Sequence, residues 1–269
     1  MPNILTLRPL EPELPVLFTH VPKTGGSTIT GAMAALFGRD AIAGISSAKP
    51  EQRHAFLQRC LSEGKKYVYG HFRFTDAVQV YHEANLIASL RHPLDRILSF
   101  YFMLLRAKSG FALECAEDVK GEGFRKFHDR LVRRRRQDNL MCRYFCGEPD
   151  HSAAIEILES RYGLVWDSES AFEAWRVLHR GLTGKEAPAR KPSQRNRAPV
   201  GTGTGDFSSG ARPKDYSTFL PPENLQLLLD SNSEDVRLFD WFRGKTAGSS
   251  GEDLATADIR PRGSGRGQD

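Results

Sequence analysis

The chain has 269 residues, of which 38 are Lys or Arg and 33 are Asp or Glu, so its formal charge is +5 with neutral His. Hydrophobic residues make up 39% and charged residues 26%, which is typical of a globular protein and excludes a collagen, a coiled-coil rod and a wholly disordered chain. No run approaches the roughly 18 unbroken apolar residues of a membrane helix, and four Cys are too few for a disulfide framework. The N-terminal stretch, interrupted by Pro and Glu, makes a poor signal peptide. We therefore expect a cytoplasmic protein without a membrane span.

Short apolar runs alternate with amphipathic stretches along the chain. In chain order, the predicted elements are a strand over 16–21, helices over 28–38 and 50–63, strands over 65–72 and 84–92, a helix over 94–107, a helical stretch with a break over 123–146, a strand over 162–168, and helices over 169–182 and 222–243. β-branched and aromatic residues mark the strands, and apolar residues three or four positions apart mark the helices. The alternation predicts an α/β fold with a parallel β-sheet flanked by helices.

Two segments lack the composition of a packed element. Residues 184–215 are rich in Gly, Pro, Ser and Arg and predict a flexible basic loop. Residues 244–269 contain no aromatic residue and many Gly and Ser, so they cannot bury enough apolar surface to order themselves, and we expect a disordered C-terminal tail. Residues 1–243 are expected to form a single domain, since a chain of this length supplies ample material for one core.

The positive charge is concentrated in two places. Residues 120–136 hold eight Lys or Arg against two acidic residues, and residues 183–215 hold seven against three. Clustered like charge indicates an anionic ligand or partner, and the alternative is a solvated helix face and loop. The first segment fits an anionic glycan or a nucleic acid equally well, but the sequence carries no recognised nucleic-acid fold, so we expect no nucleic-acid partner.

The strongest local pattern is PKTGGST (22–28), between the first strand and the first predicted helix. Gly25 and Gly26 let the backbone turn tightly, and the free N–H groups of the following helix favour a phosphate. Lys23 adds a positive charge, and hydroxyl donors come from Thr24, Ser27 and Thr28. The lysine precedes the glycines, unlike the lysine of nucleotide triphosphatase loops. This order predicts a phosphate cradle without a metal ion.

A second anion site is predicted at SLRHPLDRILSFYF (89–102). Arg91 ends the third strand, and Ser99 lies two turns into the helix that follows. An arginine offers a forked pair of donors to a phosphate, although Arg91 could instead pair with Asp95. The carboxyl ends of parallel strands share one edge of the sheet, where ligands bind. Two anion sites at one edge indicate a nucleotide with two separated phosphates.

These two segments resemble the 5′- and 3′-phosphate-binding segments of carbohydrate sulfotransferases of the heparan sulfate 2-O-sulfotransferase type. The likeness runs from about residue 16 to residue 243 and includes DNLMCRYFCG (138–147), similar to the family's Asn-x-x-x-Arg helix, and Asn196 in its basic loop. The resemblance implies a P-loop-like sulfotransferase fold and an O-sulfotransferase that uses 3′-phosphoadenosine 5′-phosphosulfate (PAPS) and a saccharide or other hydroxyl acceptor. It implies donor binding by Arg91, Ser99, Asn196 and the loop from Lys23 to Thr28, with no metal.

A hydroxyl nucleophile needs a base, and His is the usual candidate at neutral pH. His71 ends the second predicted strand, at the same edge as the two anion sites, and the preceding Gly70 leaves room for an acceptor. The resemblance also points to His71 because the family carries a catalytic Gly-His at this place. The heparan enzyme has His-Gly-His, whereas this chain has Tyr69 at the first position. His20 is a weaker rival for the same role.

Two other functions remain open from the residues alone. One is a nucleotide phosphotransferase with a degenerate phosphate loop, and the other is a non-catalytic protein that binds an anion or a glycan on the same scaffold. The acceptor is equally open among a sugar, a lipid-linked glycan and a small metabolite. Whether the segment 120–136 contacts the acceptor, and whether a second residue assists His71, also stay open.

Overall fold

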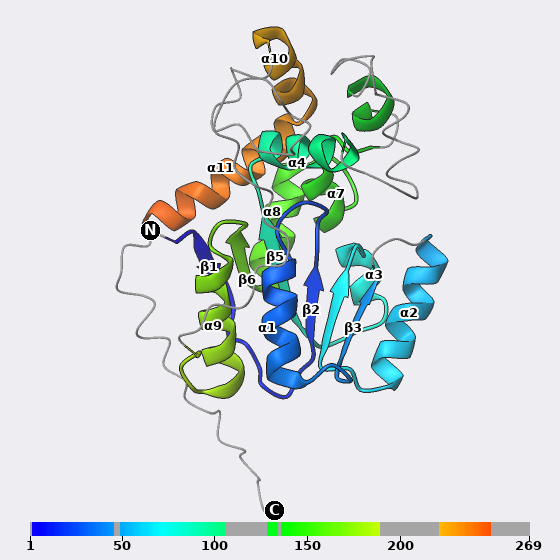
Figure 1. The fold of residues 1–269 in the computed structure, drawn as a ribbon, viewed down its shortest axis with the longest axis vertical. Coiled ribbons are helices and arrows are strands. Elements are labelled where there is room, and N and C mark those ends of the chain that lie inside the picture. The colour runs from blue at the N-terminus through cyan, green and yellow to red at the C-terminus, as the bar shows by residue number, and fades with distance from the viewer. Residues whose placement is uncertain (1, 46–48, 106–127, 134–135, 189–220, 249–269) are drawn as a thin grey trace, which may run out of the picture.

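A computed structural model describes residues 2–45, 49–105, 128–133, 136–188 and 221–248. They form a six-stranded sheet with helices on both faces (Figure 1). The strands are β1 (Ile4–Thr6), β2 (Val16–Thr19), β3 (Ile42–Ile45), β4 (Tyr67–Gly70), β5 (Asn85–Leu90) and β6 (Tyr162–Asp167). Their order is β1-β6-β5-β2-β4-β3, and every neighbouring pair is parallel except β1 and β6. The predicted α/β fold with a parallel sheet is confirmed.

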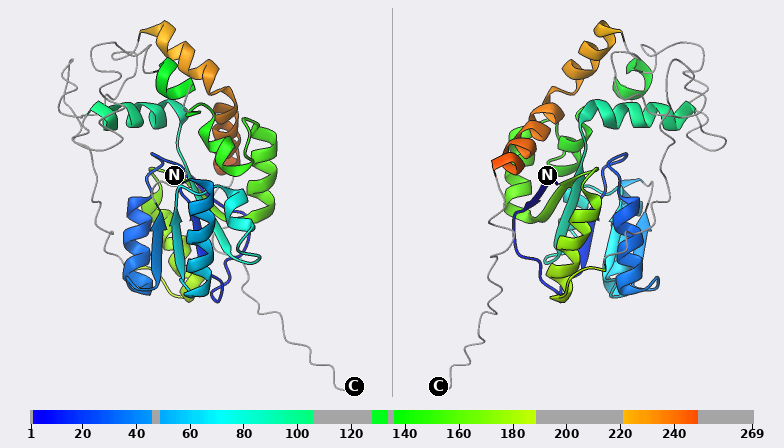
Figure 2. Two further views of the ribbon diagram at one scale, coloured as in Figure 1. Left: turned by 90° about the vertical axis from the view of Figure 1, so that its right-hand side faces the viewer. Right: turned by 60° about the vertical axis from the view of Figure 1, so that its left-hand side comes forward.

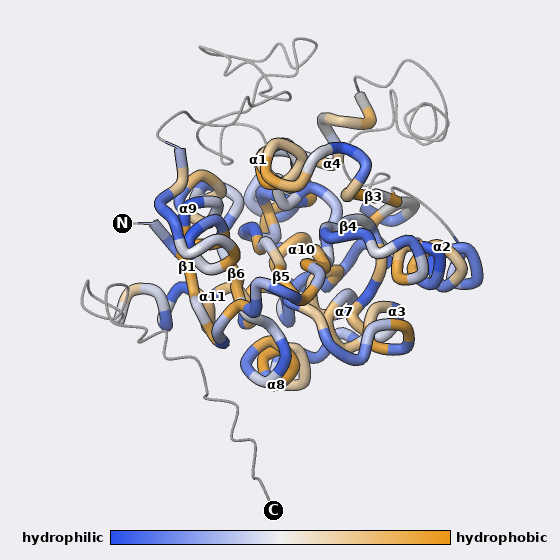
Figure 3. Tube along the Cα trace, turned by 90° about the horizontal axis from the view of Figure 1, so that it is seen from below, coloured by the Kyte–Doolittle hydropathy of each residue, from blue (hydrophilic) through white to orange (hydrophobic). Residues whose placement is uncertain are grey.

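The described helices cover the two faces unequally. They are α1 (Ser27–Phe37), α2 (Pro50–Ser62), α3 (Phe74–Val78), α4 (Pro93–Leu105), α7 (Leu140–Phe145), α8 (His151–Arg161), α9 (Ala171–Thr183), α10 (Pro222–Ser231), α11 (Ser233–Gly248) and a π-helical turn, η1 (His128–Arg133). Seen from below, α1 and α9 lie on one side of the sheet and α3, α7 and α8 on the other (Figure 3). Among the described residues, no helix combines the length and apolar character needed to cross a bilayer.

Two hydrophobic clusters form the core, one on each face of the sheet. Alternate residues of a strand point to opposite faces, so Leu17 of β2 joins the cluster under α2, α7 and α8, while the adjacent Phe18 joins the cluster under α1 and α9. Phe18 packs there against Trp166 of β6, with ring centroids 5.4 Å apart. A strand that is buried on both faces, as β2 is, reads as a continuous apolar run, which explains why the sequence marks it clearly.

The topology brings three distant segments to one edge. β2 lies between β5 and β4, and all three run in the same direction. The loop 22–28, Arg91 and His71 each follow one of these strands directly, so they meet at the carboxyl edge of the sheet. The helices α4, α10 and α11 lie beyond this edge (Figures 1 and 2). The predicted shared edge is therefore present.

Several elements differ from the sequence predictions. The short strands β1 and β3 were not predicted, because three or four residues of ordinary composition carry little pattern by themselves. The helix α8 was not predicted either, because only Ala154 and Leu158 of its eleven residues are fully buried and its apolar face is weakly marked. The predicted helix 222–243 is divided at Asn232, whose side-chain oxygen accepts a hydrogen bond from the Asn139 N–H (3.1 Å). Both differences are created by partners that lie far away in the sequence.

The disordered tail was expected to begin at residue 244, which is too early. The helix α11 continues to Gly248, five residues past the predicted boundary at residue 243. Lys245 forms an ion pair with Glu159 (3.1 Å), and the Thr246 hydroxyl donates to the Asn3 side chain (3.4 Å). These contacts with α8 and the N-terminal segment offset the poor composition of the last turn.

Part of the sequence predictions lies outside the described residues. Asn196, residues 189–215 of the predicted basic loop, residues 249–269 of the tail and most of the segment 120–136 belong to this group. Within residues 184–188, Gly184 ends α9 with a left-handed backbone (φ 68°).

Candidate functional site

The loop between β2 and α1 has the backbone of an anion-binding concavity. Lys23 and Gly25 have left-handed φ angles of 73° and 89°, whereas Gly26 returns to the helical region with φ −65°. Alternating backbone handedness turns successive N–H groups toward one side. The first bond inside α1 runs from the Thr30 N–H to the Gly26 carbonyl (3.1 Å), so the N–H groups of the first turn have no partner within the helix itself. Within the loop, the Thr24 N–H is bonded to the Val21 carbonyl (3.3 Å) and the Gly26 N–H to His20 Nε2 (3.2 Å). The first turn of α1 therefore supplies the backbone donors and the helix dipole for an anion.

The hydroxyl residues of this loop lie in different surroundings. Thr24 is fully buried, its hydroxyl donates to the Val21 carbonyl (2.8 Å), and its Oγ1 lies 2.7 Å from Ser89 Oγ of β5. Ser27 is exposed at the loop surface, and Thr28 is 8% exposed. Thr24 therefore anchors the loop to the sheet, while Ser27 presents its hydroxyl outward. Sequence reasoning could not find Ser89, because nothing local links it to a loop 65 residues away.

Arg91 joins the two predicted anion segments. Its Nη1 donates to the carbonyl of Lys23 at 2.9 Å, across 68 residues of sequence. The bond places the guanidinium group against the loop that carries Lys23, and both side chains are half-buried. Ser99 lies in α4 and is also half-buried. The Arg91 side chain thus contacts the backbone of the loop that carries Lys23, at the carboxyl edge where the sequence places the two phosphate sites.

His71 has a defined tautomer. Its Nδ1 lies 2.7 Å from the carbonyl oxygen of His20, and because a carbonyl only accepts, Nδ1 carries the proton. The neutral ring therefore has its lone pair on Nε2. Burial, followed by the positive charge of Lys23, lowers the pKa of His71, while the bond to His20 opposes the shift. His71 is consequently a neutral imidazole at neutral pH with one nitrogen available as a base.

The imidazole of His20 is already engaged in a hydrogen bond. Its Nε2 accepts a hydrogen bond from the Gly26 N–H at 3.2 Å. Burial first, and then the proximity of His71 and Lys23, lower the pKa of His20 to about 3. The nitrogen that would take a proton is already engaged, so of the two histidines His71 has the geometry of a base.

Tyr69 is half-buried and packs against the hydrophobic core. Its ring stacks on Tyr67 with centroids 5.4 Å apart and fills the space above Gly44. The histidine nearest to His71 is instead His20, whose ring centroid lies 5.1 Å away. The structure therefore places a second imidazole, from the residue that follows β2, beside His71, a position that the sequence pattern around residue 71 could not indicate.

The Asn-x-x-x-Arg segment (139–143) links two helices by hydrogen bonds. Asn139 has left-handed φ (45°), and its side-chain oxygen accepts hydrogen bonds from the N–H groups of Glu234 and Asp235 (3.0 and 3.1 Å). In the opposite direction, the carboxylate of Asp235 accepts hydrogen bonds from the N–H groups of Met141 and Cys142 (3.0 and 2.9 Å). The start of α7 and the start of α11 thus cap each other. This junction lies beyond the carboxyl edge and holds the helices above it.

A charged cluster outside the site has a structural explanation. The potential ligand atoms of Asp150, His151 and Glu234 all lie within 4.8 Å of one another. His151 Nδ1 is 2.6 Å from Glu234 Oε2, which links α8 to α11. Asp150 accepts from the N–H groups of Ser152 and Ala153 and caps α8. These bonds hold helices together, and none of the residues predicted for the site belongs to the cluster.

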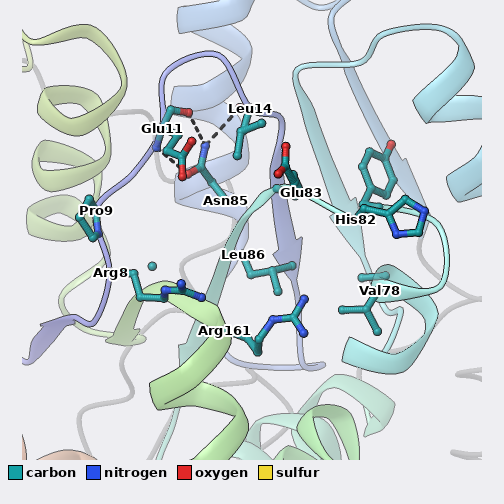
Figure 4. Close-up of a pocket in the computed structure, with 14 residues that line it drawn as sticks. Arg8, Pro9, Glu11, Leu14, Val78, His82, Glu83, Asn85, Leu86 and Arg161 are labelled. Carbon is teal, nitrogen blue, oxygen red and sulfur yellow. Dashed lines mark hydrogen bonds between the residues drawn. The ribbon is translucent and has the colours of Figure 1, made fainter. Parts of the chain in front are cut away.

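A cavity of about 320 Å³ lies at the opposite edge of the sheet, where β2 and β5 begin. Figure 4 shows Arg8 and Arg161 on one side of it and Glu11 and Glu83 on the other. Asn85 fixes the adjacent loop by donating to the carbonyl oxygen of Glu11 (2.7 Å). The cavity contains none of the residues predicted for donor binding or catalysis, so it is separate from the candidate site.

The residues at the carboxyl edge suit a donor with separated phosphates. Backbone N–H groups, the Lys23 ammonium and the Ser27 hydroxyl are donors of the kind that phosphates bind. At Gly25 an added Cβ would lie 3.2 Å from the Cβ of Ser168, so the loop lies close against the end of β6 and leaves little room for a side chain. Arg91 supplies a second cationic side chain, bonded to the backbone of the same loop. The donor set fits a nucleotide such as PAPS.

The model of a family described as the sulfotransferase family matches residues 10–242, which is most of the chain. No curated protein matches the chain. The matched range contains both anion-binding segments, His71 and the junction of α7 with α11.

Proposed function

Because the chain belongs to the sulfotransferase family, we propose that it transfers a sulfuryl group from PAPS to a hydroxyl group of a carbohydrate or glycan-like acceptor. The family establishes sulfuryl transfer in general, and the donor, the acceptor class and the residue roles are our proposal. The bond between Arg91 and the Lys23 carbonyl is the observation that carries it. It brings together the residues assigned to the two phosphates of one donor.

Lys23 and the loop hold the 5′-phosphate end of the donor. The N–H groups at the start of α1 and the hydroxyls of Ser27 and Thr28 add hydrogen bonds, and Thr24 keeps the loop on β5. Arg91 and Ser99 hold the 3′-phosphate. Asn196, outside the described residues, stays a predicted contributor to donor binding.

PAPS supplies a sulfuryl group on a good leaving group, which needs no metal in this proposal. As the acceptor oxygen approaches sulfur, Nε2 of His71 takes the hydroxyl proton. The acceptor O–S bond forms, the S–O bond to the 5′-phosphate breaks, and adenosine 3′,5′-bisphosphate leaves. Lys23 stabilises the negative charge that grows on the leaving phosphate oxygen, a kind of electrostatic contribution that is usually large in group transfer.

Thermal unfolding with nucleotides tests donor binding. Adenosine 3′,5′-bisphosphate should raise Tm more than equal concentrations of AMP or ATP, because at equal concentration the ligand that binds the folded state more tightly stabilises it more. Acceptor screening with labelled PAPS then tests transfer. Turnover of ATP that depends on Mg²⁺ would favour the phosphotransferase alternative. Binding of the bisphosphate without transfer to any acceptor would favour a non-catalytic role. The cytoplasmic location stays a prediction from the sequence.

A further inference from the structure

His20 lies at a junction between the donor loop and the base. Its N–H donates to the Gly70 carbonyl (3.0 Å), and its own carbonyl accepts the proton of His71 Nδ1 (2.7 Å). Its imidazole accepts from the Gly26 N–H (3.2 Å). One residue therefore contacts the end of β4, the base and the N-terminus of α1.

The imidazole of His20 is held in one orientation. Its ring stacks on Phe18 with centroids 5.1 Å apart and an angle of 23°. On the other side it meets Gly26, where an added Cβ would lie 2.7 Å from His20 Nε2. The ring is thus confined between the sheet and the loop, with its acceptor nitrogen facing the first residue before α1.

The imidazole of His20 must be neutral to make its bond to the Gly26 N–H. A protonated Nε2 could not accept the Gly26 N–H and would place a positive charge beside Lys23 and His71. Burial and these two neighbours lower the pKa of His20 to about 3, so the acceptor persists at every pH at which His71 can serve as a base.

We propose that His20 is a positioning residue whose imidazole anchors the Gly26 N–H and thereby holds the donor loop in register with His71. The inference rests on the proposed function and adds to it a residue that contacts neither donor nor acceptor. With the Gly26 N–H bonded to His20 and the Thr24 N–H bonded to the Val21 carbonyl (3.3 Å), the N–H groups of the first turn of α1 are left for the donor. A donor site that is arranged before binding does not lose affinity to the ordering of its loop.

Two substitutions separate the hydrogen bond from the shape of the ring. His20→Phe keeps an aromatic ring over Phe18 but leaves the Gly26 N–H without its acceptor. His20→Gln offers a side-chain oxygen at about the distance of Nε2 along the side chain. Both variants keep the backbone carbonyl that binds His71. The affinity for adenosine 3′,5′-bisphosphate, measured by calorimetry, and the KM for PAPS and kcat are compared with those of the natural protein.

We expect His20→Phe to weaken bisphosphate binding about tenfold, which is the effect of losing one hydrogen bond and stranding its donor. The KM for PAPS should rise with it, while the KM for the acceptor stays within about threefold. His20→Gln should recover most of the lost affinity. General structural damage would instead reduce the active fraction and leave the affinity of the remaining sites unchanged. Natural affinity in His20→Phe, or equal losses in the two variants, would overturn the proposal.

The two proposals can fail separately. If the natural protein does not bind the bisphosphate, the proposed function is wrong. The anchoring bond is then judged by ¹⁵N spectra of the histidines, in which His20 should show a pyridine-type Nε2 and stay neutral down to about pH 4, together with a shift of the Gly26 amide resonance in His20→Phe. A protonated His20 at neutral pH, or an unmoved Gly26 resonance, would overturn the anchoring role regardless of activity.

Discussion

Lys23 adopts a backbone angle that glycine reaches freely and other residues reach at a cost. Its φ of 73° lies in the left-handed region, between the buried Val21 and Thr24. Such conformations persist only where the surrounding structure enforces them, and they cluster at functional sites. Here the bond from Arg91 to the Lys23 carbonyl provides part of that enforcement. The residue that carries the proposed charge is therefore also the one whose backbone shapes the loop.

His71→Ala should lower turnover about a hundredfold or more, because a general base commonly contributes that much. The pH profile of the natural protein is the sharper measurement. The lowered pKa of His71 means that its base form persists below the ordinary pKa of about 6.5, so kcat/KM should decline only at more acidic pH. His82→Ala, at an exposed histidine near the opposite edge, is the control and should leave the rate unchanged. An acidic limb at or above pH 6.5 would contradict the assignment.

Arg91→Ala and Lys23→Ala should each weaken bisphosphate binding by roughly tenfold or more, since hydrogen bonds to charged groups contribute about 1.5–3 kcal/mol. The double variant should lose less than the product of the two, because removing Arg91 also releases the Lys23 backbone. Calorimetric titration of all four proteins measures the coupling. Lys66→Ala, an exposed lysine before β4, is the matched control. Strict additivity would show that the two side chains act independently.

The parallel strands β5, β2 and β4 supply the site through their register. Thr19 of β2 pairs with Gly70 of β4 and with Ala88 of β5, so the three strands reach the edge nearly together. The residues that follow them emerge side by side for that reason. A slip of one residue would turn a strand's side chains to the other face, and the cores on both faces prevent it. The elements thus fix the spacing of the site before any of its side chains interact.

The end of β4 is packed so closely that it allows no side chain at Gly70. An added Cβ would collide with the carbonyl oxygen of Ile45 in β3. Gly70→Ala should therefore destabilise the protein by about 2 kcal/mol or more, because two strands must separate. Gly31→Ala is the matched control, since Gly31 lies on the exposed side of α1 with open space around it and should gain about 0.5–1 kcal/mol. Urea unfolding measures the free energy of unfolding of both variants. Similar values for the two would refute the close packing at Gly70.

At the scale of the whole molecule, the last described helix, α11, is bonded to the segment that precedes the first strand, β1. Asn3 accepts from the Thr246 hydroxyl (3.4 Å) and donates to Asp167 Oδ2 (2.6 Å), so α11, β1 and β6 meet at one point. Arg243 lies 3.9 Å from the same carboxylate. Residues 3 and 243–246, which are far apart in sequence, thereby stabilise the edge of the sheet next to β6.

This closure predicts a difference between two truncations. A chain that ends after Arg243 should be less stable by about 1–2 kcal/mol than a chain that ends after Gly248, because it loses the Lys245–Glu159 pair and the Thr246 hydrogen bonds. Equilibrium unfolding of the two proteins in the same buffer makes the comparison. Equal stability would mean that the last turn of α11 contributes nothing to the fold.

The sequence by itself determined the class of fold and the identity of most candidate residues. Buried parallel strands such as β2 and β5 are continuous apolar runs, and the loop 22–28 carries its glycines, lysine and hydroxyls within a few positions, so local pattern was enough. The bond of Arg91 to Lys23, the inward direction of Thr24, the bond of the Gly26 N–H to the His20 ring and the division of the last helix at Asn232 were decided only in three dimensions. Each depends on a partner dozens of residues away, and hydrogen bonding between such partners leaves no periodic trace along the chain.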